Sequence, residues 1–191
     1  IEIDNSAATA DAESKATSSR SRRAALIALD QMDNGGLQSN RITSLLDSQD
    51  PLLRETAWWI AGHHPDWGSA LAGFFQTHLA RTGISAAERT ELEQKLALFG
   101  DNIAVQELLA GQVDHAASRG ERLSALGTMA TIARTRVKTL PPAWMAPLLR
   151  TLSSEDIEVA TAAVSVVRAV PAAKDAAPGF KVPYRLTPVP A

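Results

Sequence analysis

Residues 45–62 read LLDSQDPLLRETAWWIAG, and this stretch decides the predicted fold. Two leucines end a short apolar segment, and the polar residues 47–50 then form a turn. Pro51 follows at a first helical position, where its missing N–H has no helical partner to lose. Leu53 and Ala57 come next at helical spacing. The stretch therefore predicts two helices joined by a tight turn.

The same layout returns near the other end of the chain, in LLRTLSSEDIEVATAAVSVV at residues 148–167. The corresponding residues are Asp50 with Asp156, Leu53 with Val159, and Ala57 with Ala163. We expect the aspartate to cap the second helix, the branched residue to pack inward, and the alanine to let paired helices approach closely. Such a hairpin cannot bury its apolar face alone, so its neighbours must stack on it.

The rest of the chain is also predicted to be helical. Aromatic residues make up only 5% of the sequence, alanine and leucine are abundant, and no alternating strand pattern or hairpin turn occurs. We predict an all-α fold, an α-α superhelix of stacked antiparallel pairs with about nine helices. A helical bundle without repeats is the alternative. The expected helices cover approximately residues 22–32, 42–46, 51–62, 67–79, 85–99, 101–111, 119–133, 141–152 and 155–170.

The two ends differ in composition from this helical domain, which we place at residues 21–170. Residues 1–20 are rich in small and polar side chains, which predicts a flexible linker. Residues 171–191 are rich in proline, which predicts an extended tail. Because the chain starts at Ile1 without a signal segment, we expect either a processed protein or an internal piece of a larger one.

Composition excludes several classes of function. The chain has no cysteine, so it offers no thiol catalyst, disulfide or covalent haem attachment of its own. Its net charge of -2 does not indicate a nucleic-acid groove. No apolar run approaches the length of a membrane span. We expect a protein partner or the flanking domains of the same polypeptide, with no nucleic acid, no membrane insertion and no cofactor.

Asp50 and Arg54 match the turn aspartate and the second-helix arginine of the HEAT-repeat family, which residues 22–170 resemble. Asp47 is a second candidate for the aspartate. At the second copy the arginine position holds Ala160, and the middle of the chain departs further from the pattern. The resemblance implies a scaffold that binds proteins along its stacked second helices.

A narrower resemblance lies in ETAWWIAGHHPDWGSALAGFF, residues 55–75. It is similar to the helical region of planctomycete-type membrane-bound dehydrogenase or PVC-type haem-binding proteins. That family joins a β-propeller, a HEAT-like region and a cytochrome c domain in one exported chain. The resemblance implies a periplasmic or exported helical spacer, and it assigns redox chemistry to no residue here.

The histidines raise the question of a metal site. A site would need His63, His64 and His78 to converge with a carboxylate such as Asp66. Adjacent histidines point in different directions, and no spacing typical of a zinc enzyme occurs. We expect these histidines to have loop and packing roles.

Trp58 and Trp59 are the most conspicuous aromatic pair. Adjacent helical residues point about 100° apart, so the two rings cannot share one pocket. We expect one to pack against the preceding helix and the other against the next repeat, with an aromatic binding platform as the alternative. The candidate partner-binding residues are Arg54, Glu55, Trp58 and Trp59.

No catalytic motif accompanies these residues. The chain has no nucleophile elbow, phosphate loop or dinucleotide fingerprint. The basic runs at residues 20–23 and 134–138 are expected to be solvated surface. We therefore expect no enzyme but a non-catalytic interaction or scaffold module, a fragment of a larger multidomain protein. The alternative is a structural spacer between a propeller and a cytochrome c domain.

Overall fold

The computed structural model describes residues 18–32, 35–81 and 83–171. Within these ranges it contains nine α-helices, one 3-10 turn and no strand, so the all-helical prediction is confirmed for the described part of the chain. The elements are α2 (Ser19–Gln31), α3 (Ser39–Thr43), α4 (Pro51–His63), η1 (Pro65–Trp67), α5 (Gly68–Leu79), α6 (Ala86–Ala97), α7 (Ile103–His115), α8 (Arg119–Thr135), α9 (Pro142–Leu152) and α10 (Ile157–Ala169).

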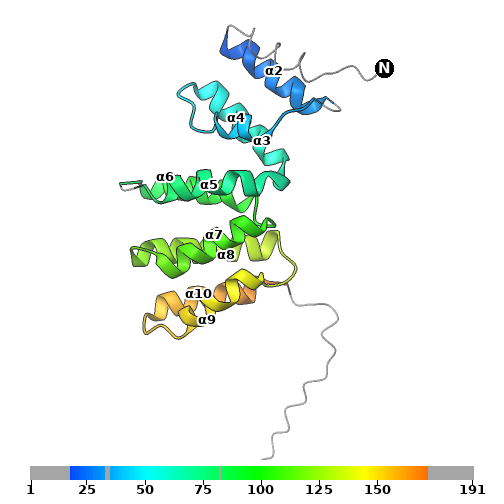
Figure 1. The fold of residues 1–191 in the computed structure, drawn as a ribbon. Helices are drawn as coiled ribbons and strands as arrows, with labels where there is room; N and C mark the ends of the chain where they lie inside the picture. Colours follow the sequence, from blue (N-terminus) through cyan, green and yellow to red (C-terminus); the bar gives the residue numbers. More distant parts are fainter. Residues whose placement is uncertain (1–17, 33–34, 82, 172–191) are drawn as a thin grey trace, which may run out of the picture.

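The helices lie in two layers that run down the length of the molecule (Figure 1). One layer holds α3, α5, α7 and α9, each packed against the next. We call these the first helices. The other layer holds α2, α4, α6, α8 and α10, which we call the second helices. Within this layer α2 packs on α4, α6 on α8, and α8 on α10, whereas α4 and α6 barely approach each other. Each first helix also packs against the second helix that follows it.

One hydrophobic core runs through the stack from α2 to α10. Trp144 on α9 is fully buried, and its indole N–H donates to the carbonyl of Gln106 on α7 over 3.0 Å. The side-chain amide of Gln106 in turn donates to the carbonyl of Gly100 over 2.9 Å. Buried polar groups thus satisfy one another where α7 and α9 meet, as a close-packed interior requires.

Several predicted boundaries need correction. Helix α2 begins at Ser19, inside the predicted linker 1–20, because the Ser18 hydroxyl accepts from the Ser21 N–H and caps the helix. Helix α7 is capped by Asn102 and continues through Gly111 to His115, beyond the predicted end at residue 111. The linker residues 1–17 and the tail residues 172–191 lie outside the described residues. None of the described helices is both long and apolar enough to cross a membrane.

The four second helices that follow α2 begin in two related ways. Asp50 accepts from the N–H groups of Leu52 and Leu53 at 2.9 and 3.3 Å, as expected for a cap. Asp156 repeats this arrangement at the start of α10 over 3.0 and 3.2 Å. The middle two second helices use serine caps instead, Ser85 and Ser118, each followed by a glutamate three residues later. Caps therefore recur roughly every 35 residues, a spacing within the range of repeat proteins.

An arginine follows three of these four caps by four residues. Arg54 donates to the Ser48 carbonyl over 2.8 Å, Arg89 to that of Leu79 over 3.1 Å, and Arg122 to that of Val113 over 3.0 Å. Each carbonyl lies in or near the last turns of the preceding first helix, where helical carbonyls lack partners. The HEAT-like pattern predicted only Arg54, although the recurrence of a cap followed four residues later by arginine also points to Arg89 and Arg122.

Candidate binding groove

The second-helix layer is interrupted between α4 and α6, and one repeated position differs there. Seven residues after the cap, three of the second helices carry a buried alanine, at Ala57, Ala125 and Ala163. The same position on α6 is Leu92, which is only half-buried. A small side chain lets two helices approach closely, whereas a leucine needs more space between them.

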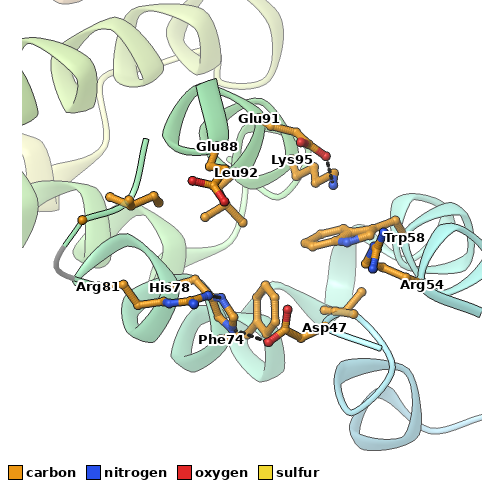
Figure 2. A pocket seen from close by; sticks show the side chains of 13 residues that line it. Asp47, Arg54, Trp58, Phe74, His78, Arg81, Glu88, Glu91, Leu92 and Lys95 are labelled. Atoms are coloured by element: carbon orange, nitrogen blue, oxygen red, sulfur yellow. Dashed lines mark hydrogen bonds and ion pairs between the residues drawn. The ribbon is translucent and has the colours of Figure 1, made fainter. Parts of the chain in front are cut away.

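A cavity of about 300 Å³ lies in this gap, and we call it the α4–α6 groove. Arg54 and Trp58 line it from α4, and Phe74 and His78 line it from α5. The opposite wall is α6, which contributes Leu92, Lys95 and two glutamates (Figure 2). The groove thus combines an apolar floor with charged rims.

Trp58 is the centre of the groove. Its ring meets Phe74 edge-on, with 5.6 Å between ring centroids, and lies 5.8 Å from Phe75. The ammonium of Lys95 lies 4.4 Å from the centroid of the Trp58 ring, and it also pairs with Glu91 one turn earlier on α6. The Lys95 side chain therefore reaches across the opening from α6 to α4, as Figure 2 shows.

The charges along the groove are balanced in sign. Glu88 accepts from both the backbone N–H and the hydroxyl of Ser85, and these hydrogen bonds hold the pKa of its carboxyl below the usual range. Glu88 is therefore ionised at neutral pH. His78 stacks on Phe74 with 4.0 Å between ring centroids, and its Nε2 lies 3.9 Å from a carboxylate oxygen of Asp47. The rims present fixed charges of both signs around an aromatic floor.

The four candidate binding residues separate into two pairs. Arg54 and Trp58 line the groove, whereas Glu55 and Trp59 do not. Trp58 packs against the next helix pair, as expected. Trp59 is 44% exposed and lies against His63 on its own helix, with 4.4 Å between ring centroids. The rotation of about 100° per residue points it away from the direction of Trp58.

His63, His64 and His78 each contact different residues. His64 pairs with Asp30 over 2.6 Å and stacks on Trp67, while His63 hydrogen-bonds the Trp59 carbonyl over 2.7 Å. His78 lies in the α4–α6 groove. Across residues 18–32, 35–81 and 83–171, no three histidine or carboxylate side chains come together in a way that could hold a metal ion.

Comparison of the sequence with protein-family models and with curated proteins gave no match.

Proposed function

We propose that this chain is a non-catalytic protein-interaction module built of HEAT-like repeats, and that it forms part of a larger multidomain protein. Two observations support the HEAT-like assignment: the stacked helix pairs, and the recurrence of a cap followed by arginine at three second helices. The observation that carries the binding role is the α4–α6 groove, where Trp58 is half-buried on the floor beneath Lys95.

The lining of the groove suits a peptide segment. Trp58 and Leu92 offer apolar contact area, and tryptophan and arginine are the side chains most enriched at binding hot spots. Arg54 and Glu88 provide charges of opposite sign on the two walls. A bound segment with one apolar side chain between charged residues would bury the first and pair the others.

The polar groups of the groove favour binding over catalysis. Glu88 holds the Ser85 cap, Glu91 pairs with Lys95, and Asp47 faces His78 across 3.9 Å. The two contacts there between a hydroxyl or amine and a carboxylate are the Ser85–Glu88 helix cap and the Lys95–Glu91 pair one turn apart on α6, and both have structural explanations. These contacts fix the positions of the charged side chains around the groove, which suits a recognition surface.

A spacer role is the second candidate, and one end of the stack favours it. Helix α9 exposes Met145, Leu149 and Leu152 along one face, and α10 exposes Ile157 and Val164. Their spacing of three, four and seven residues makes an apolar stripe on each helix. We call these two stripes the α9–α10 end face. A flanking domain of the same polypeptide packed there would extend the core of the stack.

Photo-crosslinking in the native host cell tests both roles. A benzophenone amino acid is placed at Glu91 in the α4–α6 groove, at Leu149 in the α9–α10 end face, or at exposed Ala70 on α5. Mass spectrometry then maps the crosslinked residues. An interaction module predicts one defined segment of another protein crosslinked at position 91 and none at position 70.

The outcomes separate the two candidates. Crosslinks from position 149 to flanking residues of the same polypeptide, without a defined product at position 91, would favour the spacer. Equal and diffuse products at positions 91 and 70 would reject the interaction module. Adding Trp58→Glu to the position 91 variant serves as a control, because a charged side chain on the floor must abolish a specific product.

A further inference from the structure

A second groove lies on the opposite side of α6, where it packs against α8. Its volume is about 310 Å³, and its walls carry small side chains such as Thr90, Ala97, Ser124 and Thr131. Among the described residues, Glu93 is the only charged one that lines it. We call it the α6–α8 groove. Its single charge distinguishes it from the α4–α6 groove, where both signs alternate.

The Glu93 carboxylate is incompletely paired. Only 7% of this residue is exposed. Its Oε2 accepts from the Ser124 hydroxyl over 2.5 Å, whereas its Oε1 is buried and has no hydrogen-bond partner among the described residues. The Thr128 hydroxyl donates to the Ser124 carbonyl at 3.2 Å and also lies near enough to the carboxylate to lower its pKa. An unsatisfied buried acceptor is costly, and most native examples have a role that explains them.

The nearest cation is already engaged elsewhere. Arg89 lies one turn earlier on α6, and its guanidinium donates to the Leu79 carbonyl and to Glu121, each over 3.1 Å. Burial outweighs the attraction of Arg89 and raises the pKa of the Glu93 carboxyl above its usual range. The groove therefore lacks a positive charge that could pair with this carboxylate.

We propose that the α6–α8 groove binds the side chain of a lysine from a protein partner, whose ammonium pairs with Glu93. This inference rests on the proposed interaction role and names the chemistry of one partner residue. The methylene groups of a lysine would pack along Ala97 and the threonine methyls, and its three N–H donors match the free carboxylate oxygen and the hydroxyls of the walls.

The α8 side of the groove leaves room for this occupant. Gly127 lines it, and no atom lies within 4 Å of the point where a Cβ would stand. Because Oε1 is buried in the free protein, side chains at the rim of the groove must move before the ammonium reaches it. Long polar side chains at a surface make such movements on the nanosecond scale, so entry needs no change of fold.

NMR titration of the full chain tests the proposal. The probe is the peptide acetyl-Gly-Lys-Gly-amide, and its matched control replaces lysine by norleucine, which has the same carbon chain without the charge. We expect the lysine peptide to shift amides of residues 90–97 and 124–131 in a saturable way, with a midpoint at least tenfold below that of the control. The pKa of the Glu93 carboxyl must fall when the peptide binds.

Two variants localise the effect. Glu93→Gln keeps the shape but removes the charge, and it must abolish the difference between the two peptides. Gly127→Leu fills the groove at a helical position where extra helix propensity supports folding, and it must also abolish saturation. Gly73→Leu on α5, which likewise meets no atom within 4 Å, is the matched control and must bind like the wild type.

The proposal is overturned if the two peptides shift the same amides equally, if no saturable shift occurs, or if Glu93→Gln binds lysine unchanged. Its failure is distinguishable from failure of the interaction role, since the crosslinks at position 91 depend on the α4–α6 groove. A lost lysine response with intact crosslinks at position 91 rejects only the lysine site.

Discussion

Two steps in the same layer of second helices differ sharply. Helices α8 and α10 pack closely against each other, whereas the α4–α6 groove separates α4 from α6 (Figure 1). The α8–α10 step, which we call closed, has buried Ala163 on α10. The α4–α6 step, which we call open, has half-buried Leu92 at the equivalent position on α6. The comparison teaches that a closed interface and an open groove in one layer go together with a difference in side-chain size at one repeated position.

The largest expected effect comes from exchanging these side chains. Ala163→Leu inserts three heavy atoms into a filled interface, and overpacking of this kind lowers the free energy of unfolding by about 1–3 kcal/mol. The reverse change, Leu92→Ala, removes a half-buried side chain from the edge of the groove and is expected to cost about 1 kcal/mol. Denaturant unfolding followed by circular dichroism measures both.

The exposed Ala70→Leu variant controls for the substitution itself and should stay within about 0.5 kcal/mol of the wild type. If Ala163→Leu is as harmless as Ala70→Leu, the α8–α10 step is not closed as described.

A substitution of Glu93, at the step between α6 and α8, should change the free energy of unfolding by an intermediate amount, and this change should depend on pH. Since burial raises the pKa of Glu93 in the folded chain, the folded state holds this proton more tightly than the unfolded state. The stabilising contribution of the Glu93 carboxyl is fully present below the pKa that it has in the unfolded chain. It is lost as the pH rises through the higher pKa that the carboxyl has in the folded chain. Glu93→Gln should therefore be more stable than the wild type at pH 7, by roughly 1 kcal/mol, and lose that advantage near pH 4.

Thermal unfolding at a series of pH values measures this difference. Ser124→Ala is a useful second variant, because it removes the hydroxyl that now pairs with Glu93 and should enlarge the pH dependence. A stability difference between Glu93→Gln and the wild type that is independent of pH would contradict the account.

The smallest effect is expected at the open step. Lys95→Met removes an i,i+4 ion pair with Glu91 and a cation from the face of Trp58. Both interactions are partly solvated, so the free energy of unfolding should change by less than about 1 kcal/mol. Acrylamide quenching should nevertheless increase, because the Trp58 ring loses its cover. Unchanged quenching would mean that Lys95 does not lie over Trp58 in solution.

Much of the fold was predictable from local signals. Asp50 and Asp156 precede apolar helical patterns, and both act as the expected caps. The two middle helix pairs were not predicted as repeats because Ser85 and Ser118 stand where the outer pairs have aspartate. The arginine four residues after each serine is nevertheless visible in the sequence. Repeats that preserve a contact while changing its residue type are harder to recognise than repeats of sequence.

The grooves were only partly predictable. Trp58 and Arg54 were chosen because they lie on a second helix, and they do line the α4–α6 groove. The other wall belongs to α6, more than 30 residues later, and no local pattern relates Leu92 and Lys95 to Trp58. Glu93 was one of several scattered acids in the sequence, and only tertiary packing separates it from its exposed neighbours.

The most direct test of the central claim is a distance measurement between second helices. The chain has no cysteine, so paired nitroxide labels can be attached at chosen sites without background. Trp59 and Gln94 on α4 and α6 are exposed and stand nine residues after their caps, and Gly127 and Ser165 are their equivalents on α8 and α10. Pulsed electron paramagnetic resonance should give a longer distance for the pair 59–94 than for the pair 127–165. An equal or shorter distance for 59–94 would contradict the open step and, with it, the recognition surface assigned to it.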